Sequence, residues 1–131
     1  MKVMESKSGP FKFCGSCKQE WRTWAGFVED PAVRLRGLQS VAGHPASNLL
    51  VFEHSCGSSV SVLASRLRHL LPPPDSEAPL PVLYGTQECR GHCRFLEDLE
   101  ACDAPCANVH DRALILIIQC LKKAVEQTVG A

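Results

Sequence analysis

Four cysteines concentrated in one short segment constrain this chain more than any other feature of its sequence. The segment Glu88–His110 contains Cys89, Cys93, Cys102 and Cys106, arranged as two C-x3-C pairs with eight residues between the pairs. Residues i and i+4 of a helix lie on one face, so each pair could bring two sulfurs together. Such a cluster is typical of a metal site, a pair of disulfides or a redox centre, and each demands a different fold.

One zinc ion held by all four thiolates is the favoured interpretation, because sulfur is a soft donor that suits zinc. An iron–sulfur cluster is the main alternative, although the spacing matches none of the ferredoxin patterns. Two disulfides across a helical hairpin would resemble the twin C-x3-C proteins of oxidising compartments. Those proteins usually have a longer separation, and Pro105 disfavours a helix here. Free thiols remain as a further alternative, and His92 or His110 could replace one cysteine as a ligand.

A second set of candidate ligands lies in the N-terminal half and consists of Cys14, Cys17, His54 and Cys56. Cys14 and Cys17 have C-x2-C spacing, which lets two sulfurs turn towards one point. Cys56 occurs in the predicted turn "HSCG", where Gly57 allows the backbone to bend. With His54 as the fourth ligand, this set predicts one tetrahedral metal site.

Two turns that clasp one ion in this way resemble a zinc ribbon or a pair of rubredoxin-like knuckles. The resemblance is carried by "CGSC" and "HSCG" alone, within residues 1–64, and it implies a structural zinc site in a small β fold. The second turn has H-x-C where the family has C-x2-C, so His44 in the preceding loop rivals His54 as the fourth ligand. A thioredoxin-like dithiol is an alternative, because "FCGSC" could join a strand to a helix, but little chain precedes Cys14 for the βα unit required.

The remaining patterns predict an α+β fold, in which a small antiparallel β part precedes the cysteine-cluster loop and a long C-terminal helix. Alternating apolar residues predict a strand at "VRLRGLQSV" and a β-hairpin over 48–64. Thr23 is placed to cap a short helix, "WAGFVED". The proline-rich "PPPDSEAPLP" is predicted to be a linker. The predicted parts are a zinc-ribbon-like β part at 1–71, the linker at 72–81, and a four-cysteine knuckle with the C-terminal helix at 82–131.

The C-terminal helix, predicted over about 109–128, carries more apolar surface than one side of a small domain covers. Its widened apolar stripe consists of Leu114, Ile115, Leu116, Ile117, Ile118, Leu121 and Val125. So wide a face predicts a homodimer, or docking of another protein partner on the helix. The alternative is a helix buried wholly within its own chain. Cys120, within the same helix, is predicted to be an inert buried thiol.

Charge and hydropathy exclude several classes of partner. The 14 basic and 14 acidic residues balance, so neither an anionic membrane nor nucleic acid is expected to bind. The opening "MKVMESKSGPFKFC" has no apolar signal-peptide core, and the apolar run "ALILII" is far shorter than the roughly 20 residues that span a bilayer. A cytoplasmic location is therefore expected, where dense cysteines favour metal or redox chemistry over structural disulfides.

These observations predict a non-catalytic metal-binding protein, with zinc at both cysteine sites, that acts as an interaction or regulatory module. The sequence contains no G-x-S-x-G, Walker or G-x-G-x-x-G motif, and protein ligands fill both predicted sites, so no position is left for substrate water. No enzymatic activity is expected. The alternative is an iron–sulfur or dithiol redox protein for electron transfer or redox sensing, including a thioredoxin-like oxidoreductase.

Overall fold

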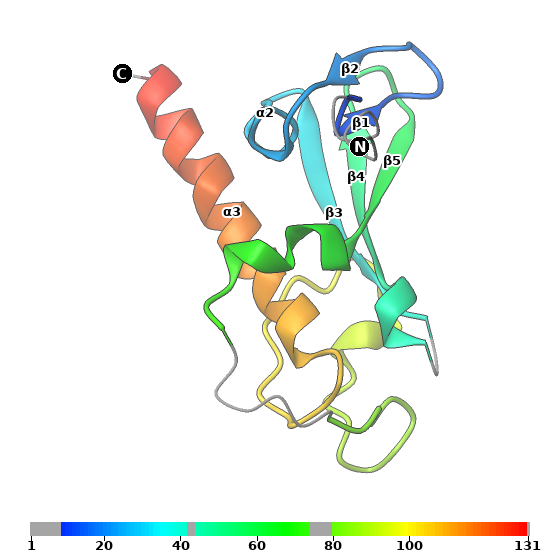
Figure 1. Cartoon of the computed structure of the whole chain (residues 1–131). Coiled ribbons are helices and arrows are strands. Elements are labelled where there is room, and N and C mark those ends of the chain that lie inside the picture. The colour runs from blue at the N-terminus through cyan, green and yellow to red at the C-terminus, as the bar shows by residue number, and fades with distance from the viewer. Residues whose placement is uncertain (1–8, 42–43, 74–79, 131) are drawn as a thin grey trace, which may run out of the picture.

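The computed structural model describes residues 9–41, 44–73 and 80–130, and these residues form the predicted α+β fold. Two small antiparallel sheets are followed by a cysteine-rich loop and a long helix (Figure 1). The elements are β1 (Lys12–Phe13), β2 (Glu20–Trp21), α2 (Trp24–Val28), β3 (Val33–Gln39), η1 (Pro45–Ser47), β4 (Leu49–His54), β5 (Ser59–Leu63), η2 (Ala64–Leu70), η3 (His92–Arg94) and α3 (Val109–Gly130). Within the described ranges, no helix is both long and apolar enough to cross a membrane. The cytoplasmic location stays a prediction.

The larger sheet has the strand order β3-β4-β5, with β4 in the centre. β4 and β5 form the hairpin predicted over 48–64. Along β3, Val33 and Leu35 are buried while Arg34 is exposed, which is the alternation expected of a half-buried strand. The pairing of β3 with β4 shifts register between Leu35 and Gly37, where the strand bulges.

The Phe27 side chain of the short helix α2 packs against both sheets. Thr23 caps it as predicted, and its side-chain oxygen accepts a hydrogen bond from the Gly26 N–H at 3.0 Å. Phe27 is completely buried, with its ring centroid 4.8 Å from that of Phe52 in β4 and 5.0 Å from that of Trp21 in β2. These edge-to-face contacts hold the small β1–β2 hairpin against the larger sheet.

One side of α3 completes the hydrophobic core. Leu114, Ile115 and Ile118 are fully buried and belong to the same core as the strand residues. The helix packs against η2, β3 and α2. The core therefore contains residues from both the N-terminal and the C-terminal part of the chain. The part boundaries at residues 71 and 81 stay a prediction, and positions 74–79 of the linker lie outside the described residues.

The burial of two α3 residues, Cys120 and Ile115, differs from what the sequence predicted. Cys120 is exposed, so the prediction of a buried thiol is wrong. It follows Ile118 by two residues, or about 200° around a helix, and so lies on the side away from the core. Ile115 is buried within its own chain instead of widening an outer apolar face, whereas Leu116 is 44% exposed. Over residues 109–125, the helix is therefore not wholly buried within its own chain, and its use as a contact surface stays a prediction.

Candidate metal centre

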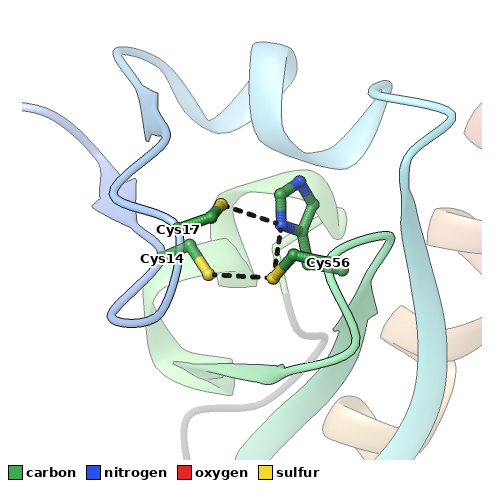
Figure 2. Close-up of side chains that lie close together, drawn as sticks. Cys14, Cys17 and Cys56 are labelled. Atoms are coloured by element: carbon green, nitrogen blue, oxygen red, sulfur yellow. Dashed lines mark hydrogen bonds between the residues drawn. The ribbon is translucent and has the colours of Figure 1, made fainter.

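The first turn of the centre lies between β1 and β2. The Cys14 N–H donates to the Gln19 carbonyl at 2.8 Å, and the Lys18 N–H donates to the Cys14 carbonyl at 2.9 Å. Lys18 has a left-handed backbone with φ +68°, and its ammonium donates to the Gly15 carbonyl at 3.0 Å. These bonds fold the C-x2-C segment back on itself, so that the sulfurs of Cys14 and Cys17 both face the second turn (Figure 2).

The second turn joins β4 to β5. The N–H of His54, the last residue of β4, donates to the Ser58 carbonyl at 2.9 Å, and the Gly57 N–H donates to the His54 carbonyl at 2.8 Å. Gly57 has φ +96°, a conformation that residues with a side chain rarely adopt. This tight turn places the Cys56 sulfur 3.3 Å from the Nδ1 atom of His54.

The four predicted ligands of this set converge on one point. Their donor atoms, the sulfurs of Cys14, Cys17 and Cys56 and a ring nitrogen of His54, all lie within 4.8 Å of one another. The Cys14 and Cys56 sulfurs are 3.6 Å apart. The His54 Nδ1 atom is 3.5 Å from the Cys17 sulfur and 3.3 Å from the Cys56 sulfur.

Three of these separations are close to those expected between the ligands of one tetrahedral ion. An ion at roughly 2.3 Å from sulfur and 2.0 Å from nitrogen separates two sulfurs by about 3.8 Å, and a sulfur from a nitrogen by about 3.5 Å. The observed distances lie within a few tenths of an ångström of both values. The chain therefore has a possible metal site made of three cysteines and one histidine.

Burial and packing identify which histidine joins the site. His54 is only 4% exposed, and its ring meets the Trp21 ring edge-on with 5.1 Å between centroids. That contact holds the imidazole with Nδ1 towards the thiols. The rival, His44, is an exposed residue at the start of η1 and is not part of the cluster. The choice between the two depends on tertiary packing, which spacing along the chain does not contain.

Hydrogen bonds around the centre favour the thiolate form of two cysteines. The pKa of Cys14 is lowered to about 5, chiefly by the Cys17 N–H and then by the Ser58 hydroxyl. That hydroxyl lies 3.1 Å from each of the Cys14 and Cys56 sulfurs, and it is the main cause of the lowered pKa of Cys56. The hydrogen bond between the His54 imidazole and the Cys56 sulfur, which favours the protonated ring, in turn raises the pKa of His54. Ser58 was not a sequence candidate, and its only signal is its place two residues after Cys56.

The second predicted set lies towards the other end of the β3-β4-β5 sheet (Figure 1). Cys89, Cys93, Cys102 and Cys106 line one small cavity. All eight cysteines of the chain fall in described residues, and all are free thiols. Among those residues, only the first set has its donor atoms within 4.8 Å of one another, so a second metal site is not shown. It stays a prediction.

The alternative ligands proposed for the second set have other partners. His92 borders the cavity, but its Nδ1 atom lies 3.0 Å from the Asp98 carboxylate. His110 lies beside Arg68 at a different pocket. His92 therefore borders the cavity of the four cysteines, whereas His110 does not.

The chain was compared with protein-family models, with curated proteins and with solved structures, and none of them matches it. What can be said of its chemistry therefore rests on its own side chains. Those side chains form one possible metal site, made of three cysteines and one histidine, in a cysteine-rich fold.

Proposed function

We propose that the chain is a non-catalytic zinc protein whose Cys14, Cys17, His54 and Cys56 centre stabilises an interaction or regulatory module. The single observation that supports this is the tetrahedral spacing of three sulfurs and one imidazole nitrogen. Zinc suits this donor set, because it binds thiolate and imidazole together and prefers four tetrahedral ligands. Four protein ligands also leave no open position for a substrate or for an activated water.

The architecture around the centre supports a structural role. β1 and β2 have two residues each, and a hairpin of this size is not stable by itself in water. An ion shared by the β1–β2 turn and the β4–β5 turn would join this hairpin to the larger sheet. Two turns that clasp one ion are also the arrangement of a zinc ribbon, the resemblance noted in the sequence. With H-x-C in the second turn, this chain would be a variant of that arrangement.

A protein contact through α3 is part of this proposal. Leu116 and Cys120 are exposed on the side of the helix that faces away from the core. We favour a second copy of the chain as the partner, because two-fold self-pairing is the commonest closed assembly. The measurement that tests this contact is given in the Discussion.

A thiol redox protein is the second candidate, and the lowered pKa of Cys14 favours it, because reactive cysteines have stabilised thiolates. Cys14 is completely buried, however, while Cys17 is exposed. Thiol titration separates the candidates. Zinc-bound cysteines should react slowly until a chelator is added, whereas a redox pair would titrate reversibly with a dithiol buffer.

The metal content of purified protein tests the proposed function. Full-length protein prepared under reducing conditions should contain zinc, and Cys14→Ser should lose one zinc per chain, because serine keeps the shape but removes the thiolate ligand. Cys120→Ser is the matched control, since this cysteine is exposed on α3 and should not affect the zinc content. Wild-type protein without metal, or Cys14→Ser with its full zinc content, would contradict the proposal.

A further inference from the structure

Beyond the first centre, we propose that Cys89, Cys93, Cys102 and Cys106 bind a single zinc ion, which closes the cysteine-rich loop against α3. The four cysteines come from separate turns of a segment with little regular structure, yet they line the same cavity. The cavity has room for about 10 Å³, close to one water-sized particle. A space of this size suits one ion.

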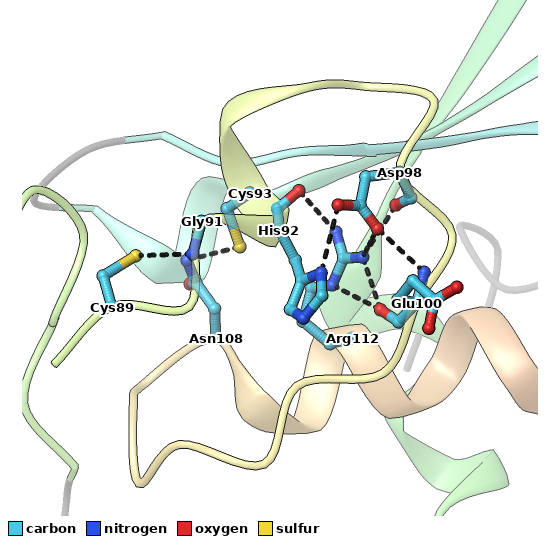
Figure 3. Close-up of polar contacts among 8 residues, drawn as sticks. All are labelled: Cys89, Gly91, His92, Cys93, Asp98, Glu100, Asn108 and Arg112. Carbon is cyan, nitrogen blue, oxygen red and sulfur yellow. Dashed lines mark hydrogen bonds and ion pairs between the residues drawn. The ribbon is translucent and has the colours of Figure 1, made fainter.

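Backbone donors are already directed at two of the sulfurs in a repeated pattern. The Gly91 N–H lies 3.4 Å from the Cys89 sulfur, and the Asn108 N–H lies 3.5 Å from the Cys106 sulfur (Figure 3 shows the first). In both cases the donor is two residues after the cysteine. Donors in this position stabilise a thiolate and orient it, as second-shell groups do around bound metals.

Two further donors reach the same set. The Leu83 N–H donates to the Cys106 sulfur at 3.3 Å, and the Asn108 side-chain amide donates to the Cys93 sulfur at 3.5 Å. Asn108 therefore contacts one cysteine from each C-x3-C pair. The two pairs are thus held by hydrogen bonds to the same residue, which lies just before α3 begins.

A buried arginine holds the loop that connects the two pairs. Arg112 of α3 is completely buried, and its guanidinium donates to the carbonyls of His92 at 3.3 Å, Asp98 at 2.7 Å and Glu100 at 3.0 Å (Figure 3). Since α3 is part of the core, these bonds fix the loop relative to Cys106, which precedes the helix. The loop is thus held in place by a side chain of α3, whereas the turns of the first centre are held by strand pairing.

The sulfurs still need a cation to draw them together. No three of the four lie as close to one another as the donor atoms of the first centre do. Four thiolates would repel one another in a small cavity, and a divalent ion would both neutralise this repulsion and shorten the separations. We assign all four ligands of this centre to sulfur, because the four cysteines line the same cavity.

Counting the ions per chain by native mass spectrometry tests this proposal separately from the first centre. We expect two zinc ions in the full-length wild type, one in Cys102→Ser, one in Cys56→Ser, none in the double variant and two in the Cys120→Ser control. If Cys56→Ser kept every ion while Cys102→Ser lost one, the first centre would fail and this one would stand. An ion count that is the same in Cys102→Ser as in the wild type would overturn the second centre.

A spectroscopic measurement tests the second centre even if Cys102→Ser does not fold. Zinc X-ray absorption of the Cys56→Ser protein reports only the ion at the second centre, with that centre's cysteines intact. Four sulfur neighbours without nitrogen are expected. Nitrogen or oxygen in the coordination shell would overturn the proposed ligand set. Bound iron with a brown colour, or two disulfides in place of the ion, would replace the single-zinc proposal with a cluster or an oxidised pair.

Discussion

The two cysteine regions of this chain bring their sulfurs together by different means. In the first, each pair of ligands lies on a tight turn between antiparallel strands, and the turns are held by backbone hydrogen bonds and by aromatic packing. In the second, the cysteines lie on a loop that is held by Arg112 and by N–H donors to sulfur. The donor atoms of the first set all lie within 4.8 Å of one another, and the described residues of the second set form no such group.

The comparison teaches how preorganisation depends on the supporting structure. Strand pairing positions a turn from both sides, so ligand atoms on it are placed before any ion arrives. A loop that is anchored at a few carbonyls keeps its cysteines around one cavity. Their sulfurs would reach ligand distance only when the ion binds. The expected energetic consequence is that losing the first ion disturbs the β part, whereas losing the second frees a loop and leaves α3 packed in the core.

The largest expected effect is the loss of the first ion. In Cys56→Ser, the free energy of unfolding should fall by several kcal/mol, though by less than the roughly 10 kcal/mol that structural zinc supplies in small isolated sites, because the hydrophobic core remains. Urea unfolding followed by circular dichroism measures it. Cys120→Ser should stay within about 0.5 kcal/mol of the wild type. An unchanged unfolding midpoint in Cys56→Ser would rule out a structural role for the first centre.

Arg112→Met should have the next largest effect, because it removes the buried guanidinium that three loop carbonyls and the Asp98 carboxylate share. We expect a loss of about 3 kcal/mol in stability. Release of the second ion to a chelator should become about 10- to 100-fold easier, because the loop loses its anchor. The first ion in the same molecule is an internal reference whose release should not change. Equal acceleration at both centres would indicate general unfolding instead of a local anchoring role.

A matched variant strengthens the test of Arg112. Arg34 forms an exposed ion pair with Glu53 across β3 and β4. Exposed pairs contribute only about 0–1 kcal/mol, so Arg34→Met should change stability little and should affect neither ion. If it destabilised the protein as much as Arg112→Met, burial would not explain the role of Arg112.

Gly37→Ala tests the contact between β3 and the second region. Gly37 has φ +153°, and a Cβ atom there would lie 1.6 Å from the Leu96 carbonyl oxygen, so the loop would have to move. A loss of about 1–3 kcal/mol is expected from the strained backbone and the displaced loop. Hydrogen exchange should become faster in the loop around residues 92–100 but not in β4. Gly15→Ala is the control in the first region, because a Cβ atom there would meet nothing within 4 Å.

The smallest effect on stability is expected from Leu116→Glu. This residue is 44% exposed, so the free energy of unfolding should change by less than about 0.5 kcal/mol. If α3 mediates self-association, the variant should be a folded monomer by light scattering, whereas Glu20→Lys, a charge change on an exposed residue of β2, should remain a dimer. A wild type that is already monomeric at high micromolar concentration would end the homodimer proposal. Ile115 is unsuitable for this test, because it is buried in the core.

Much of the fold follows from local patterns that the sequence alone determines. Alternation along β3 and the apolar segments around "HSCG" specify strands and a hairpin, Thr23 specifies a helix start, and the long apolar stripe specifies α3. The C-x2-C and H-x-C spacings likewise indicate Cys14, Cys17 and Cys56 as candidate ligands of the first centre. These features were predictable because each depends on residues only a few positions apart, whose geometry is set by the backbone.

Only the tertiary structure decides between candidates that local patterns leave equal. It selects His54 over His44 through packing against Trp21, and it buries Ile115 while exposing Cys120. The anchoring role of Arg112 also depends on contacts between residues far apart in the chain. Spacing along the sequence specifies which side chains can share a face, but the packing of the elements determines which face meets the core, a ligand or solvent.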